Sequence, residues 1–221
     1  MNIVLTGATG MVGEGVLHEC LNHPKITKVT IINRRPSEMQ HPKLREILHS
    51  NLQDLTPILP QLENIQACFF CAGVTSIGKK EPEYTQLTYD LTLGFVKSLA
   101  TKFPDLIVTY VSGQATDSSE KGKVMWARVK GRTENQLLQL PIRAAFMFRP
   151  GFMKPTQGLK RTLGFAKVLN PLYKPLKLLF PNSVCTLAEV GQAMINCALV
   201  GAPMPILEVK DIVKQAHRFD E

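Results

Sequence analysis

The chain has 221 residues, of which 44% are hydrophobic and 20% charged, and its formal net charge is +8. A globular chain of this length buries about 70–75% of its unfolded surface, so it needs no disulfide or metal for stability. No run of about 20 apolar residues is present, which predicts no transmembrane segment. The N-terminus has no charged leader, and the five scattered cysteines suit a reducing cytosol, so we expect a cytoplasmic protein.

Strand-like and helix-like segments alternate along the chain. Strands are expected near 2–6, 28–33, 67–71, 106–111 and 144–148, with a weaker one near 48–53. Helices are expected near 11–22, 42–48, 83–102, 123–139 and 186–199, and a last strand and helix near 205–216. Most strand runs are continuously apolar, as in parallel strands covered on both faces. The pattern predicts an α/β protein with a doubly wound parallel sheet of the Rossmann type.

We expect one domain over 1–221, with a dinucleotide-binding core over 1–150 and a C-terminal cap region over 151–221. The helical and strand patterns loosen after Arg149-Pro150-Gly151, where prolines become frequent. This segment is interpreted as a short substrate cap packed over one end of the sheet.

Three glycines, Gly7, Gly10 and Gly13, lie between the first strand and the first helix. Glycine lets the backbone come close to a pyrophosphate, and the helix N-terminus directs unpaired N–H groups at it. The alternative is a tight turn that only packs against its neighbours. We expect the following turn residues to bind the cofactor: Gly7, Thr9, Gly10, Met11, Val12 and Gly13.

The second strand runs into Asn33-Arg34-Arg35-Pro36. NAD sites usually carry an acid about 20 residues beyond the glycines, bonded to the ribose 2′-hydroxyl, and none is present here. Guanidinium groups bind a 2′-phosphate or stack on adenine. Arg34 and Arg35 therefore favour NADP(H) over NAD, the alternative being two exposed loop charges.

Cys68 and Cys71 form a Cys-x-x-Cys pair in an apolar run. A redox pair needs a helix N-terminus to lower the pKa of a thiol. A strand instead places residues three apart on opposite faces, so core packing is the interpretation we favour. The five histidines show no ligand spacing, and we expect no metal site.

Several motifs resemble extended and atypical short-chain dehydrogenases/reductases. "TGATGMVG" resembles their glycine turn, and "NRRP", "VKGRTE" and "FRPG" resemble the branch that includes the Tat-interacting-protein homologues. The resemblance implies an active-site serine at Ser112 and a catalytic-helix lysine at Lys130, which would also bind the nicotinamide ribose. It further implies cofactor contacts at Asp54, Leu55, Cys71, Ala72, Gly73, Pro150 and Gly151.

The family mechanism requires a tyrosine four residues before the lysine, and this chain has Trp126 there. An indole N–H donates a hydrogen bond but does not titrate near neutral pH. Trp126 is a packing residue in a site without turnover, shapes a pocket in which Tyr89, Tyr110 or a water moves the proton, or is turned into the core. Two functions follow: an NADP(H)-dependent oxidoreductase or epimerase-like enzyme acting on an unidentified small molecule, and a non-catalytic nucleotide-binding regulatory or scaffold protein.

The segment 153–181 mixes lysines with apolar residues, and no acid occurs between Glu134 and Glu189. A solvated cap over an apolar core is the interpretation we favour. An amphipathic surface for anionic lipid is the alternative, which would give a peripheral membrane contact. Nucleic acid ranks last because no recognition motif is present, so we expect no such partner. Helices on the sheet faces commonly pair in the family that the chain resembles, which leaves a homodimer open.

Overall fold

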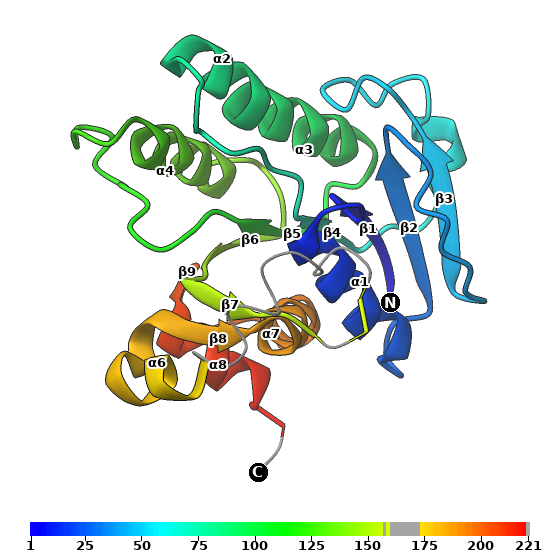
Figure 1. Ribbon diagram of the computed structural model, residues 1–221. Helices are drawn as coiled ribbons and strands as arrows, with labels where there is room; N and C mark the ends of the chain where they lie inside the picture. Colours follow the sequence, from blue (N-terminus) through cyan, green and yellow to red (C-terminus); the bar gives the residue numbers. More distant parts are fainter. Residues whose placement is uncertain (157, 160–172, 220–221) are drawn as a thin grey trace.

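The computed structural model describes residues 1–156, 158–159 and 173–219 (Figure 1). Within them, seven parallel strands form the central sheet in the order β3-β2-β1-β4-β5-β6-β9. The strands are β1 (Asn2–Thr6), β2 (Lys28–Asn33), β3 (Leu44–Leu48), β4 (Ala67–Phe70), β5 (Ile107–Val111), β6 (Ala144–Arg149) and β9 (Ile206–Glu208). The strand order reverses at β1, which has β2 on one side and β4 on the other. Ligands of such sheets bind at this reversal, outside the carboxyl ends of the strands.

Helices cover both faces of the sheet (Figure 1). One face carries α1 (Met11–Asn22), α7 (Leu187–Val200) and α8 (Val209–Ala216). The other carries α2 (Glu81–Thr85), the π-helical turn η2 (Gln86–Asp90), α3 (Leu91–Lys102) and α4 (Met125–Leu138). The doubly wound Rossmann-type sheet expected from the sequence is confirmed.

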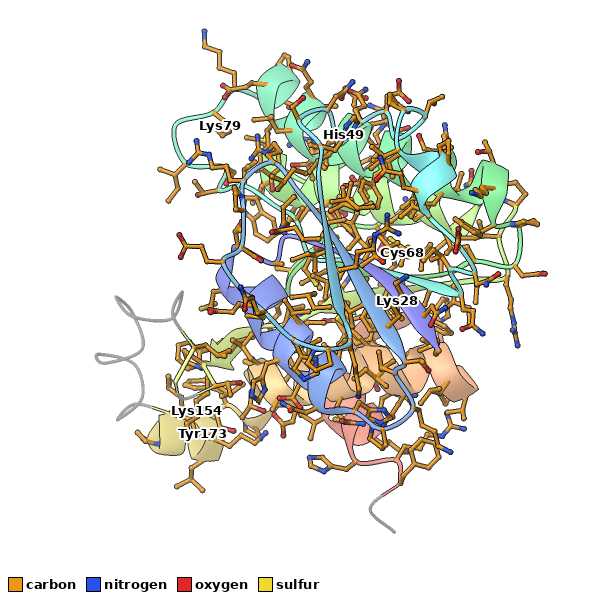
Figure 2. The ribbon with its side chains drawn as sticks, turned by 90° about the vertical axis from the view of Figure 1, so that its right-hand side faces the viewer. Lys28, His49, Cys68, Lys79, Lys154 and Tyr173 are labelled. Carbon is orange, nitrogen blue, oxygen red and sulfur yellow. The ribbon has the colours of Figure 1, made fainter. Side chains whose placement is uncertain are left out.

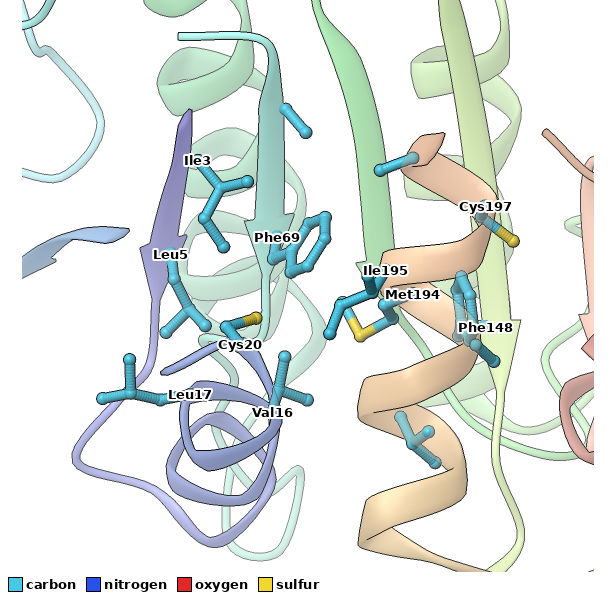
Figure 3. Close-up of a cluster of buried hydrophobic side chains, with 14 of the residues drawn as sticks. Ile3, Leu5, Val16, Leu17, Cys20, Phe69, Phe148, Met194, Ile195 and Cys197 are labelled. Carbon is cyan, nitrogen blue, oxygen red and sulfur yellow. The ribbon is translucent and has the colours of Figure 1, made fainter. Parts of the chain in front are cut away.

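Figure 3 shows the core between the sheet and helices α1 and α7. Ile3, Leu5 and Phe69 lie on one face of their strands and pack near Val16 and Met194 of the two helices, and all five side chains are fully buried. Because side chains of a strand alternate in direction, Val4 and Cys68 belong to the second core, beneath α3 and α4. This double burial is why the strand runs are continuously apolar.

One predicted element is wrong and one is shifted. The helix expected near 42–48 is strand β3, and the weak strand expected near 48–53 begins and ends earlier. Leu44 and Ile47 are three residues apart, which is helical spacing, but β3 is an edge strand in which only Ile47 is buried. Its structure comes from parallel pairing with β2, from Val29↔Leu44 to Asn33↔Leu48, which the local pattern does not show.

The C-terminal part adds a second, two-stranded parallel sheet of β7 (Phe152–Lys154) and β8 (Val184–Thr186), with α6 (Tyr173–Leu179) before β8. The ammonium of Lys154 lies 4.9 Å from the ring centroid of Tyr173 (Figure 2). Much of the basic segment, including Lys160, Arg161 and Lys167, lies outside the described residues. Within the part of the chain that is described, no helix is long and apolar enough to cross a membrane.

Candidate functional site

A cavity of about 780 Å³ opens where the strand order reverses, at the carboxyl ends of β1, β2 and β4. Five segments contribute its walls: the glycine turn, the arginine turn after β2, the loop after β3, the loop after β4, and the π-helical turn with the start of α3. The lining residues are Gly7, Thr9, Gly10, Ile32, Asn33, Arg34, Arg35, Pro36, Leu52, Cys71, Ala72, Gly73, Val74, Leu87 and Leu91. The cavity therefore brings together the turns that the sequence singled out separately.

The glycine turn is packed too closely for side chains. Gly7 has φ +76°, and a Cβ there would lie 2.6 Å from the Ala72 amide nitrogen. A Cβ at Gly13 would lie 2.1 Å from the Gly7 carbonyl oxygen. Gly10 donates its N–H to that oxygen at 2.8 Å and precedes α1 without any side-chain cap. The first-turn amides, including those of Met11 and Val12, thus have no capping side chain from Gly10. Met11, Val12 and Gly13 are not among the described residues that line the cavity.

The arginine turn follows the last residue of β2. Arg34 and Arg35 are exposed and line the cavity. Among the described residues, neither guanidinium has a hydrogen-bond or ion-pair partner. Two uncommitted cations beside a glycine turn form a binding place for an anion.

Three leucines also line the cavity: Leu52 in the loop after β3, and Leu87 and Leu91, which lie one turn apart around the π-helical turn. Asp54 is exposed, and hydrogen bonds from Thr56 lower its pKa. Leu55 is fully buried in the core. In the described structure neither Asp54 nor Leu55 lines the cavity, so their expected cofactor contacts stay a prediction. Leu52 was not identified from the sequence as a cavity residue, because it is a single leucine in a loop and belongs to no recognisable motif.

The loop after β4 brings Cys71, Ala72 and Gly73 to the cavity, and their contacts with a cofactor stay a prediction. Burial raises the pKa of the Cys71 thiol to about 12 and raises that of Cys68 as well. Cys68 belongs to the core beneath α3, whereas Cys71 packs against the core beneath α1. The sheet therefore separates the two thiols, which supports packing and not redox chemistry.

The hydroxyl of Ser112 is engaged inside the protein. Its Oγ donates toward Glu134 Oε1 at 2.5 Å and toward the Phe148 carbonyl oxygen at 3.0 Å, and the residue is only 5% exposed. A serine hydroxyl has one hydrogen to donate, and both acceptors within reach of it, Glu134 and the Phe148 carbonyl, lie inside the protein. Ser112 follows β5 as expected, but it does not offer a donor to the cavity.

Glu134 was missed by the sequence reasoning. Its carboxylate is fully buried and accepts hydrogen bonds from Arg149 Nε at 3.1 Å and Arg149 Nη2 at 2.5 Å. Arg149 also contacts Glu208 Oε1 at 3.1 Å and Ser118 Oγ. The available signal was its spacing, because Glu134 stands four residues after Lys130 and so shares its helix face.

Lys130 lies on α4 and donates its Nζ hydrogen bond to the carbonyl oxygen of Ser112. Burial lowers the pKa of Lys130 to about 8, although Glu134 acts in the opposite direction. The ammonium is therefore mostly charged at pH 7. A Cβ built at Gly113 would lie 4.0 Å from Lys130 Nζ. Because residue 113 is glycine, no side chain from that position contacts the ammonium.

Trp126 lies one helical turn before Lys130 and is half-buried. It belongs to neither core cluster of the described residues, which disfavours the interpretation that it is turned into the core.

Tyr110 and Tyr89 are the two tyrosines considered as alternative proton donors. Burial raises the pKa of Tyr110, and the Arg132 guanidinium lies 4.2 Å from the ring centroid of Tyr89. Tyr110 is therefore unsuited to proton transfer.

Pro150 and Gly151 follow β6. The Pro150 carbonyl oxygen accepts the Gln114 N–H at 2.9 Å, and a Cβ at Gly151 would lie 2.3 Å from the Ser183 carbonyl oxygen. Gln114 Nε2 in turn donates to Ser183 Oγ at 3.0 Å. These contacts tie the loop after β5 to the segment before β8, and neither Pro150 nor Gly151 is among the described residues that line the cavity.

A parallel sheet in this order, with a glycine turn at the strand reversal, defines a Rossmann-type α/β protein. The sequence profile described as "NAD dependent epimerase/dehydratase family" matches residues 3–131. The chain belongs to the NAD dependent epimerase/dehydratase family. The resemblance to short-chain dehydrogenases/reductases is confirmed.

Curated relatives resemble this chain in sequence, and solved structures share its fold. "Protein fmp52, mitochondrial" of Emericella nidulans is 27% identical over 212 residues, covering 90% of this chain and 87% of the relative. "Protein FMP52, mitochondrial" of Saccharomyces cerevisiae is 27% identical over 75% of this chain and 71% of the relative. The Bordetella bronchiseptica enzyme WbmF in complex with NAD+ has a TM-score of 0.65 at 15% identity, covering 98% of this chain and 77% of that chain. The yeast YIR035C short chain dehydrogenase/reductase has a TM-score of 0.66 at 15% identity, covering 95% of this chain and 96% of that chain.

These relatives correct one expectation. The cytoplasmic location inferred from the cysteines is wrong by this comparison, because the relatives in Emericella, Saccharomyces and Kluyveromyces are named as mitochondrial proteins. Free cysteines indicate a reducing environment but do not distinguish one compartment from another.

Proposed function

We propose that this chain binds NADP(H) in the cavity at the carboxyl ends of β1, β2 and β4. The observation that carries the proposal is a pair of guanidiniums beside the glycine turn, those of Arg34 and Arg35, for which the described part of the chain supplies no partner. A carboxylate after β2 would favour a ribose hydroxyl and repel a phosphate, and Asn33 ends that strand instead. Solved proteins of similar fold include complexes with NAD, which supports a dinucleotide ligand in general.

The residues of the cavity fit the parts of the ligand. The amides of Met11 and Val12 would bind the pyrophosphate. The pyrophosphate can approach this backbone because Gly7 and Gly13 carry no side chains. Apolar contacts from Leu52 and Leu87 would cover the adenine. The 2′-phosphate would lie against the arginine turn. When bound, the nicotinamide supplies or accepts a hydride, and the protein supplies its position.

Replacing Arg34 or Arg35 with alanine is expected to weaken NADPH binding about tenfold or more while changing NADH binding little, because a hydrogen bond to a charged group contributes about 1.5–3 kcal/mol. Calorimetric titration of each variant with both nucleotides measures this. Lys28, a half-buried lysine at the start of β2 that is not among the lining residues, supplies the matched control, Lys28→Ala. Equal loss of NADPH and NADH affinity in the arginine variants would contradict the proposed role.

Two activities are compatible with such binding, and the retained Lys130 favours an oxidoreductase or epimerase-like enzyme on a small molecule. A second candidate, a nucleotide-binding protein without turnover, is favoured by the Ser112 hydroxyl, which is directed at Glu134 and Phe148. Trp126 adds to this, because loss of a positioned acid or base costs about 10²- to 10⁴-fold in rate. We propose the second candidate.

We expect NADPH to change the fluorescence of Trp126, the single tryptophan, with no oxidation at the nicotinamide absorption band across a panel of carbonyl compounds. Trp126→Tyr is expected to remain inactive as well, because a phenol at 126 would still lack a hydroxyl partner from Ser112. Carbonyl-dependent oxidation of NADPH by the unmodified protein would contradict the non-catalytic candidate. Activity gained in Trp126→Tyr would show that position 126 alone silences the site.

A further inference from the structure

The turn that carries Arg34 and Arg35 is closed by a carboxylate from the neighbouring strand. Glu46 Oε1 accepts a hydrogen bond from Asn33 Nδ2 at 2.9 Å and a second from the Ser37 amide at 2.9 Å. Asn33 and Ser37 are the residues on either side of the two arginines and Pro36. One oxygen atom therefore ties together both ends of the turn.

The strand register explains why Glu46 reaches this turn. Glu46 pairs with Ile31 on β2, and Ile31 and Asn33 are two residues apart on the same face of the strand. The Asn33 side chain is 4% exposed, so its amide is held in place where it meets the carboxylate. The two strands also remain joined beyond their ends, since the amide of His49, labelled in Figure 2, donates to the Asn33 carbonyl oxygen at 2.9 Å.

Both donors to Glu46 are neutral. Among the described residues Glu46 forms no ion pair, and in particular none with Arg34 or Arg35, although it accepts hydrogen bonds from both ends of their turn. The guanidiniums therefore stay available to an anion while the backbone between them is fixed. A turn that is already ordered loses less conformational entropy when a ligand binds.

We propose that Glu46 is a positioning residue for 2′-phosphate recognition: by accepting hydrogen bonds from Asn33 and Ser37 it fixes the turn that presents Arg34 and Arg35. The inference rests on the proposed NADP(H) binding. Glu46 does not touch the ligand in this proposal. It acts through the conformation of the turn, and its effect is confined to nucleotides that carry the extra phosphate.

Because Glu46 is negatively charged, a positioning role and a purely electrostatic role predict opposite changes in NADPH affinity when the carboxylate is removed. Removing a carboxylate near an anion site strengthens anion binding if charge alone matters. Removing the carboxylate that closes the turn weakens it. Glutamine keeps an Oε1 acceptor without the charge, so Glu46→Gln retains the closed turn.

The test compares dissociation constants for NADPH and NADH by calorimetry in the unmodified protein and in Glu46→Ala, Glu46→Thr and Glu46→Gln. Threonine is included because a β-branched residue suits an edge strand if alanine fails to fold. Arg45→Thr is the matched control, since Arg45 is the neighbouring β3 residue and donates to the Gln61 carbonyl oxygen at 2.7 Å, away from the turn.

We expect Glu46→Ala and Glu46→Thr to weaken NADPH binding about threefold to tenfold and leave NADH binding unchanged, because two hydrogen bonds of ordinary strength are lost. Glu46→Gln and Arg45→Thr should stay close to the unmodified protein. Tighter or unchanged NADPH binding in the alanine and threonine variants, or an equal loss for NADH, overturns the role of Glu46 alone. Absence of binding by the unmodified protein overturns the proposed function with it.

Discussion

Replacing Arg149 with methionine is expected to lower the free energy of unfolding by about 3–5 kcal/mol, because it leaves a buried carboxylate without its cation. Glu134 is fully buried, and Arg149 is its charged partner through Nε and Nη2. Unfolding by urea, followed by circular dichroism, measures the change. The effect is large because the Glu134 charge has no route to water in the folded state.

Arg128→Met is the matched control. Arg128 pairs with Glu81 at 2.6 Å, as short as many buried pairs, but its side chain is 24% and that of Glu81 48% exposed. Such a pair contributes about 0–1 kcal/mol. A double variant, Glu134→Leu with Arg149→Met, should recover part of the stability lost by Arg149→Met alone, since the charge that remains without its partner, on Glu208, is 43% exposed to water. If Arg149→Met were no more harmful than Arg128→Met, the described network would not be a buried ion pair in solution.

Gly13→Ala is expected to destabilise the fold by about 3 kcal/mol, the upper part of the usual range for overpacking. A Cβ at 13 would lie 2.1 Å from the Gly7 carbonyl oxygen, 2.4 Å from the Gly7 carbonyl carbon and 2.9 Å from the Ala8 nitrogen. These are backbone atoms of the turn that would hold the pyrophosphate, so nucleotide binding is lost as well. The melting temperature should fall by about 2–4 °C for each kcal/mol.

The expected change in the free energy of unfolding for Gly13→Ala is opposite in sign to the usual effect of this substitution in a helix. A glycine to alanine change inside a helix ordinarily stabilises it by about 1 kcal/mol. Gly10→Ala supplies the control, because a Cβ there meets only the Gly7 oxygen at 3.4 Å and φ is −101°. Its cost should be about 1 kcal/mol, that of an unfavourable residue at a helix N-cap. A Gly13→Ala variant more stable than the unmodified protein would contradict the close packing of the turn.

The sequence predicted most of the fold because most strands are buried on both faces. Val4, Ile31 and Phe69 belong to continuously apolar runs, which differ from the spaced apolar residues of a surface helix. The glycine turn marks the change from β1 to α1. Strand β3 was missed for the opposite reason. It is an edge strand with one buried residue, so its identity comes from pairing with β2, a contact between segments that local periodicity does not record.

The site was predictable as a set of turns but not as a set of contacts. Motif order placed Gly10, Arg34 and Ala72 at strand ends, and the parallel sheet brings them to one cavity. The direction of the Ser112 hydroxyl depends on Glu134, which is 22 residues away along the chain. The closure of the arginine turn depends on Glu46, whose register on β3 was not predicted.

The central claim is that the glycine turn and the arginine turn together bind a dinucleotide with a 2′-phosphate. Calorimetric titration of the unmodified protein with NADPH and NADH, side by side in one buffer, tests it most directly. We predict a saturable response to NADPH and a dissociation constant for NADH that is about tenfold higher or more, as expected for charged hydrogen bonds lost with the phosphate. No response to either nucleotide, or a preference for NADH, would contradict the account.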